Sequence, residues 1–241
     1  MILESYLLRR AVCGMTTKNY NRVFLNLTRN LRRVGYSAEN LERQLADQTG
    51  DSTEWPSDDA FRVAWGSVYA YQVLNNPKIV YILKRLNEAI HRTTMEDVSV
   101  DGPLSVENIM PQQWVTNWTL PDGSKGMSFE ESWNADSTDP RAVATRQRNA
   151  AVQTFGNLTV VTQVLNATAS NSDWTTKKSI LRDSLLPINC RLQDFDTWDE
   201  SAIATRGKIL FQHALKLWPH LSQNQPAIGT VTAGAKVSAA S

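Results

Sequence analysis

Residues 106–114 read VENIMPQQW, and this stretch decides how the rest of the chain is interpreted. We expect a short strand over residues 104–110 that ends at Pro111, because proline cannot donate to a sheet. A carboxylate, Glu107, and a carboxamide, Asn108, lie near the end of this strand. Glu107 taken alone is typical of a surface acid, so its meaning depends on what the fold brings beside it.

A second stretch, GNLTVVTQVLN over residues 156–166, contains the β-branched run LTVVT, which predicts a strand over residues 158–162. Residues 166–183 read as mostly helical. The order is therefore strand, long insertion, strand and helix, and Asn166 follows Asn157 by nine positions. Taken alone, Asn157 suits a turn after Gly156, and Asn166 suits a helix N-cap.

Helical periodicity dominates the rest of the chain. Five helices are expected over residues 2–91, one from Pro140 to about residue 154, and a final amphipathic helix. The residues expected to cap or begin these helices are Thr16 or Thr17, Ser37, Ser57, Pro77, Asp139, and Asp196 or Thr197. The first helix begins abruptly at Met1, which suggests a fragment of a longer chain.

The chain divides into three predicted parts. Residues 1–91 form an N-terminal helical subdomain, and residues 92–221 form a second domain that contains both strands. Residues 222–241 are rich in small and polar residues with almost no charge, which predicts a disordered tail. The expected fold class is mainly α.

Composition and charge narrow the function classes. The chain has 241 residues, 41% of them hydrophobic, and a formal net charge of +1. Residues 1–36 nevertheless hold seven Lys and Arg against one acid, and residues 141–182 hold six against one. Such local basic stretches can form a nucleic-acid surface on a neutral protein, although solvated helix faces have the same composition.

Neither a membrane protein nor a zinc protein is indicated. No apolar run approaches the roughly 18 residues of a membrane span, and the N-terminus is too charged for a signal peptide. Cys13 and Cys190 lack the spacing of a zinc site, so we expect reduced thiols in a cytosolic protein.

The strand, strand, helix order and the nine-residue step resemble the ββα-metal or His-Me finger of HNH nucleases. Four motifs in order, VENIMPQQW, GNLTVVTQVLN, SNSDWTTKK (170–178) and WDESAIATRGKIL (198–210), sharpen this resemblance. They resemble the HNH-type domain at the C-terminus of GmrSD-type modification-dependent restriction proteins and their phosphorothioate-sensing SspE relatives. The resemblance runs from about residue 3 to residue 221, and it implies a helical domain with an embedded ββα-metal motif.

The resemblance implies a metal-dependent DNA endonuclease that nicks DNA in antiphage defence. Glu107 and Asn166 would hold a divalent cation, Mg²⁺ or Mn²⁺, with Asn171 as a weaker alternative ligand. Asn157 would brace the loop and orient the base. The residues expected to contact DNA are Lys177, Lys178, Arg182 and Arg206. Alternatively, the two lysines are a solvated pair, and Arg206 makes a salt bridge with Asp199 or Glu200.

Asn108 departs from the family pattern, which usually reads (E/D)-H-I-(L/M)-P at this place. An imidazole there would act as the general base, with an ordinary pKa near 6.5. A carboxamide is not basic, although its similar size should preserve the fold. Loss of a general base costs roughly two to four orders of magnitude in rate, so we expect a chain that binds metal and DNA but cuts poorly or not at all. Because the other motif positions are intact, an introduced substitution is expected over a natural loss.

The expected setting follows from the same resemblance. The substrate would be double-stranded DNA, the parent chain would carry an N-terminal NTPase or sensor domain, and the location would be the bacterial cytoplasm. One alternative is a non-catalytic DNA-binding or regulatory module on the same scaffold. A second is a helical interaction domain without a nucleic-acid role, and the motifs do not exclude RNA as the substrate.

Overall fold

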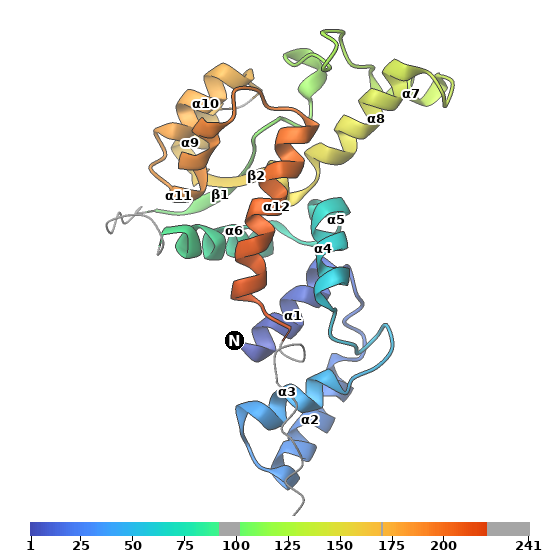
Figure 1. Cartoon of the computed structure of the whole chain (residues 1–241), viewed down its shortest axis with the longest axis vertical. Coiled ribbons are helices and arrows are strands. Elements are labelled where there is room, and N and C mark those ends of the chain that lie inside the picture. The colour runs from blue at the N-terminus through green and yellow to red at the C-terminus, as the bar shows by residue number, and fades with distance from the viewer. Residues whose placement is uncertain (92–101, 170, 221–241) are drawn as a thin grey trace, which may run out of the picture.

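The computed structural model describes residues 1–91, 102–169 and 171–220, and helices dominate these ranges. The predicted tail, residues 222–241, lies outside the described residues, as does most of the irregular segment 92–103. Figure 1 shows an elongated arrangement with the first helices at one end and the only described sheet, of two strands, in the opposite half, where α7, α8 and α10 lie beyond it. The mainly α class is confirmed.

Within residues 1–91 the structure has six helices: α1 Ile2–Val12, α2 Tyr20–Val34, α3 Ala38–Ala46, α4 Asp58–Ser67, α5 Ala70–Val73 and α6 Asn76–His91. Ser37 and Ser57 cap α3 and α4 as predicted, because each hydroxyl accepts a backbone N–H three residues later. The expected cap at Thr16 or Thr17 is wrong. The N-cap of α2 is Asn19, without a side-chain hydrogen bond, so local propensity was a weak guide to that boundary.

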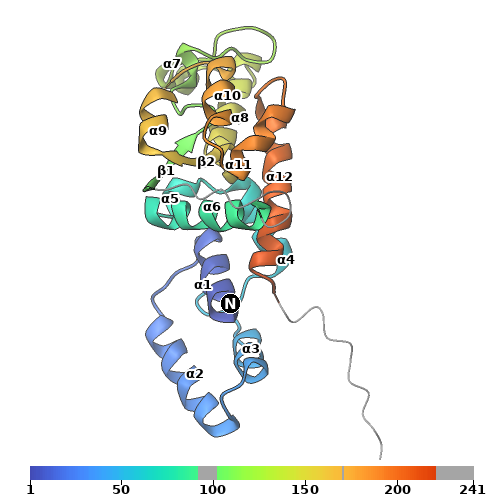
Figure 2. The same cartoon turned by 90° about the vertical axis from the view of Figure 1, so that its left-hand side faces the viewer.

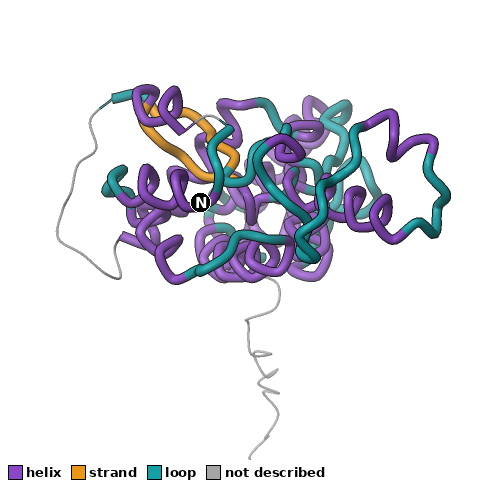
Figure 3. The backbone as a smooth tube through the Cα atoms, turned by 90° about the horizontal axis from the view of Figure 1, so that it is seen from above, coloured by secondary structure: helices purple, strands orange, loops and turns teal. Residues whose placement is uncertain are grey.

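The sheet pairs β1 Leu104–Asn108 with β2 Leu158–Thr162 in antiparallel register, so that Glu107 lies opposite Thr159 and Asn108 opposite Leu158. Strand β1 ends two residues earlier than predicted, since the N–H groups of Ile109 and Met110 are bound by Asn157 instead of by β2. Helix α9 Gln163–Ala169 follows β2 directly and contacts both strands, as α6 does. Seen from above, helices and loops surround the two strands (Figure 3).

The insertion between the strands holds 3₁₀ turn η1 Trp114–Thr116, α7 Phe129–Asn134, α8 Pro140–Val152 and 3₁₀ turn η2 Phe155–Asn157. Asp139 caps α8 as predicted. Helix α7 was not predicted. It begins with a reciprocal capping box between Ser128 and Glu131.

The last part of the chain holds α10 Trp174–Arg182, α11 Pro187–Cys190, 3₁₀ turn η3 Arg191–Asp194 and α12 Glu200–Leu217. The helix expected over residues 166–183 is instead two helices, and Asp173 caps the second. The cap of α12 is Asp199, which accepts the N–H of Ala202, so the prediction of Asp196 or Thr197 is wrong.

The hydrophobic core crosses the predicted domain boundary at residues 91/92. One cluster joins Leu8 and Phe61 of the first helices to Leu158 of β2 and Leu210 of α12. Figure 2 shows α12 running beside both α4 and α6, and these helices are in contact. The described residues therefore show no break in the core at that boundary. None of the described helices is long and apolar enough to cross a membrane.

Candidate functional site

Glu107 and Asn108 are the last two residues of β1, and their side chains point to opposite faces of the sheet because strand residues alternate. Glu107 is buried on the face that also carries Ser105, whereas Asn108 is half-buried on the face that carries Val106. The strand end therefore presents one polar side chain on each side of the sheet.

Two elements distant in sequence hold the side chain of Asn108. Its Oδ1 accepts a hydrogen bond from the Tyr71 hydroxyl of α5 at 2.9 Å, and its Nδ2 donates to the carbonyl of Val152 at 3.2 Å. Burial, and secondarily the charge of Glu107, raises the pKa of Tyr71 to about 12, so its hydroxyl remains a neutral donor at ordinary pH. Sequence analysis missed Tyr71, because no local pattern indicates a partner so far along the chain.

Asn157 is fully buried and uses all of its side-chain hydrogen-bonding capacity. Its Nδ2 donates to the carbonyls of Met110 at 2.8 Å and Val152 at 3.0 Å. Its Oδ1 accepts from the N–H of Met110 at 2.8 Å and from Trp198 Nε1 at 3.0 Å. Asn157 thus braces the loop after β1 and shares the Val152 carbonyl with Asn108. The resemblance implied a bracing role for Asn157 and also that it orients the base, and the second part stays a prediction.

Lys177 of α10 lies beneath the strand end and is fully buried. Its Nζ contacts the carboxylate of Glu107 and donates to the main-chain carbonyl of Asn108 at 2.6 Å. Burial raises the pKa of Glu107 and lowers the pKa of Lys177, and the attraction between the two charges opposes both shifts. The ammonium of Lys177 is enclosed, so the predicted contact between Lys177 and DNA is wrong. The alternative, a solvated pair with Lys178, is wrong for the same reason.

Arg206 of α12 is also buried, and burial lowers its pKa to about 9. Its Nη1 donates to the carbonyls of Gly156 and Leu158, both at 2.8 Å, which flank Asn157 on either side. The alternative salt bridge is wrong, because Asp199 caps α12 and Glu200 pairs with Arg148. Because the guanidinium of Arg206 is buried, the phosphate contact predicted for it is also wrong. Arg206 instead holds the backbone on either side of Asn157.

Lys178 and Arg182 are the two predicted DNA contacts that reach the surface of α10. The side chain of Arg182 is 63% exposed, with a weak contact to the adjacent Asp183. Lys178 is half-buried, donates to the Phe195 carbonyl at 2.7 Å and lies over the Trp174 ring. Arg182 is therefore the freer of the two cations.

Asn166 lies inside α9, so its alternative role as the N-cap is wrong. Its Nδ2 donates to Ser105 Oγ at 2.8 Å and, more weakly, to the Val106 carbonyl at 3.4 Å. Asn166 therefore faces the side of β1 that carries Glu107. Asn171, the weaker alternative ligand, is exposed, and its main-chain carbonyl accepts from Asn117.

Glu107 and Asn166 carry side-chain oxygen atoms of the kind that a divalent cation takes as ligands. Within the described ranges, no three or more His, Cys, Asp or Glu residues gather as a metal cluster. The second carboxylate oxygen of Glu107 and Oδ1 of Asn166 have no hydrogen-bond partner in the same ranges. Mg²⁺ commonly takes one or two protein oxygens and keeps several waters, so these two side chains match its ligand chemistry but do not form a closed site.

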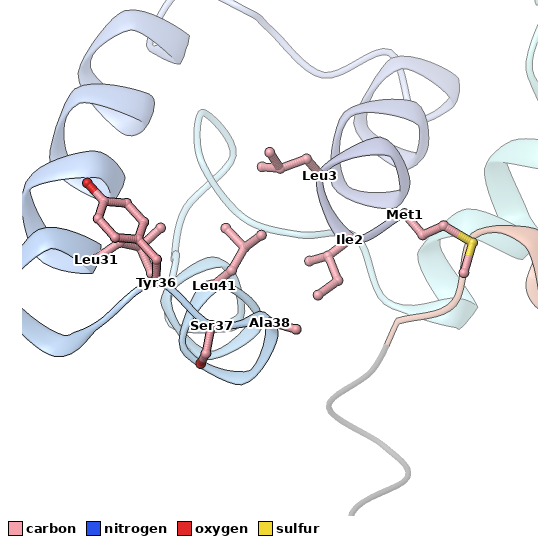
Figure 4. Close-up of a pocket in the computed structure, with 8 residues that line it drawn as sticks. All are labelled: Met1, Ile2, Leu3, Leu31, Tyr36, Ser37, Ala38 and Leu41. Atoms are coloured by element: carbon pink, nitrogen blue, oxygen red, sulfur yellow. The ribbon is translucent and has the colours of Figure 1, made fainter.

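The groove of about 680 Å³ at the opposite end of the molecule offers no comparable chemistry. It lies between α1, α2 and α3, and its lining is almost entirely apolar, with Leu31, Tyr36 and Leu41 facing Ile2 and Leu3 (Figure 4). Ser37 is its one hydroxyl outside Tyr36. Among the described residues, the groove therefore holds no charged side chain that could bind a metal ion or act as a base.

Comparison with known proteins places this arrangement in a family. Residues 55–213, well over half of the chain, match the family model of the C-terminal domain of GmrSD restriction endonucleases. No curated protein and no solved structure matches the chain. The matched range includes Tyr71, both strands and most of α12. The chain belongs to the family of C-terminal domains of GmrSD restriction endonucleases.

Proposed function

We propose that this domain is an HNH-type endonuclease module that hydrolyses phosphodiester bonds of DNA, with position 108 as the place of the general base. One observation carries the proposal. The side chain at position 108 sits at the end of β1 and donates to a carbonyl that Asn157 also holds. A base at this position would therefore be oriented by the fold before substrate arrives.

A histidine at position 108 would use the same contact. Its Nδ1–H can donate to the Val152 carbonyl where Asn108 Nδ2 now donates, and this leaves Nε2 unprotonated and able to accept a proton from water. The carboxamide of Asn108 keeps the hydrogen bond but has no basic nitrogen. We therefore propose that this chain cuts DNA more slowly than its histidine variant by roughly two to four orders of magnitude.

We propose double-stranded DNA as the substrate and Mg²⁺ or Mn²⁺ as the cofactor. Double-stranded DNA would contact the exposed cation of Arg182 and the end of Lys178. Glu107 and Asn166 would hold Mg²⁺ or Mn²⁺, which supplies charge neutralisation at the phosphate and at the leaving oxygen. Nicking in modification-dependent defence in the bacterial cytoplasm, with a sensor NTPase domain in the parent protein, follows from the family and is proposed on that ground.

A second candidate is a non-catalytic DNA-binding or regulatory module. The observation in its favour is that both polar atoms of the Asn108 side chain are satisfied, by Tyr71 and by Val152, so the carboxamide is well accommodated. Nicking of supercoiled plasmid separates the two candidates. The nuclease proposal expects the Asn108→His variant to cut and an Asn108→Ala variant to remain inactive, whereas the regulatory module expects no cutting by either variant.

A further inference from the structure

Lys177 gives the strand end a feature that neither the family nor the proposed reaction explains. Its ammonium is enclosed, yet among the described residues it contacts one carboxylate, that of Glu107, and one carbonyl, that of Asn108. A carboxylate and a peptide carbonyl are oxygen ligands of the kind that a hard cation would take. The ammonium of Lys177 therefore already occupies a position beside Glu107 that a metal ion could take.

The net charge of Glu107, Asn166 and Lys177 affects how tightly this site can bind a divalent cation from solution. Glu107 is the acidic side chain that ends β1, and Lys177 forms an ion pair with it. The remaining proposed ligand, Asn166, is neutral. The ligand set therefore has no net negative charge. A divalent ion at Glu107 would also lie close to a positive charge in a partly buried environment, where screening by water is weak.

We infer that Lys177 is an internal counter-cation that keeps the affinity of the Glu107 and Asn166 site for divalent cations low. This inference rests on the proposed function, since it concerns the same site. It assigns regulation of metal binding to Lys177, in place of the phosphate contact expected from the sequence. The neighbouring Lys178 serves as a control, because it faces Phe195 and Trp174 instead of Glu107.

Lys177 also has a structural consequence that the test must separate from charge. Its hydrogen bond to the Asn108 carbonyl holds the end of β1. A Lys177→Gln substitution removes the charge and keeps an N–H donor that can reach the same oxygens. A Lys177→Met substitution removes both. Adding Glu107→Gln to Lys177→Met removes the carboxylate as well, and it leaves no unpaired buried charge.

The test measures binding of Mn²⁺ alone, from the loss of the electron paramagnetic resonance signal of the free ion, at fixed ionic strength and without DNA. We expect Lys177→Gln to bind one Mn²⁺ about tenfold or more tightly than the unmodified chain, because a unit positive charge has been removed beside the ligand. Lys178→Met should bind as the unmodified chain does. The Glu107→Gln/Lys177→Met variant should lose the site.

Equal affinities in the unmodified chain and in Lys177→Gln would overturn the inference, and so would tight binding that survives the loss of Glu107. If a single variant is unfolded without metal, its thermal unfolding is followed against Mn²⁺ concentration. Recovery of a folding transition by Mn²⁺ in Lys177→Met, and not in the double variant, supports the inference, whereas recovery in neither contradicts it. Cutting is not measured, so these results are independent of whether position 108 carries the base.

Discussion

The hydroxyl of Tyr71 donates to the side-chain oxygen of Asn108 at 2.9 Å, across 37 residues of sequence. Tyr71 lies on α5, among the helices that precede the sheet, and Asn108 is the last residue of β1. The candidate site therefore depends on helices from both sides of the predicted boundary at residues 91/92. This dependence agrees with a family match that begins at residue 55.

Replacing Tyr71 with phenylalanine should lower the free energy of unfolding at neutral pH by about 1 kcal/mol, the usual net value of such a hydrogen bond. The pKa of Tyr71 is raised from its ordinary 10 to about 12. A raised pKa contributes stability that is present below about pH 10 and is lost as the pH rises toward 12, since only the unfolded chain ionises readily there. Urea denaturation from pH 7 to 11 should show the advantage over Tyr71→Phe shrinking above pH 10. An advantage that stays constant with pH would count against the raised pKa, and so against the burial of the Tyr71 hydroxyl.

Arg206 holds the two carbonyls on either side of Asn157. An Arg206→Met variant should lose about 3 kcal/mol of unfolding free energy, because two buried carbonyls are left without donors. Lys208→Met is the matched control, since Lys208 is exposed on the same helix. Chemical denaturation of both variants measures the difference. Equal losses would show that Arg206 does not hold this backbone.

Gly156 and Gly207 meet where η2 crosses α12, and they should differ sharply in their tolerance of alanine. A Cβ at Gly156 would lie 2.1 Å from the carbonyl oxygen of Ile203, whereas the nearest atom to a Cβ at Gly207 is 3.6 Å away. Gly156→Ala should cost about 3 kcal/mol or more through overpacking. Gly207→Ala should be neutral or stabilise, because alanine favours a helix. Thermal unfolding decides, and a tolerated Gly156→Ala would contradict the close packing described.

Arg182 is the most exposed of the cations proposed to contact DNA. An Arg182→Ala variant should bind duplex DNA more weakly at every sequence, and the slope of log affinity against log salt should fall by about 1, as for the loss of one phosphate contact. Binding by fluorescence anisotropy over a salt series measures this slope. Arg206→Lys keeps a buried charge and should leave the slope unchanged. An unaltered slope in Arg182→Ala would place the DNA elsewhere.

The elements with strong local signals were predicted from the sequence. The β-branched run fixed β2 at residues 158–162, and the short polar caps Ser37, Ser57 and Asp139 placed three helix starts. The weaker boundaries failed where tertiary contacts decide. The N–H groups of Ile109 and Met110 bind Asn157 and do not pair with β2. The N-cap of α12 is Asp199, not Asp196 or Thr197.

The site was predicted in part for the same reason. The resemblance pointed to Asn157, and its side chain hydrogen-bonds to both backbone groups of Met110, just after β1. The spacing of motifs does not predict which side chains are buried. Lys177 and Arg206 were therefore expected at the surface, and the structure shows both enclosed. Tyr71 could not be found, since an aromatic residue in a helical segment looks like any core residue until its partner is known.

Plasmid nicking by Asn108→His in Mg²⁺ or Mn²⁺ shows whether position 108 is the place of the general base. We expect this variant to nick supercoiled DNA roughly a hundredfold or more faster than the present chain, with a rate that rises with pH through about 6.5 as the imidazole loses its proton. Equal nicking rates for the two proteins, both folded by circular dichroism, would contradict it.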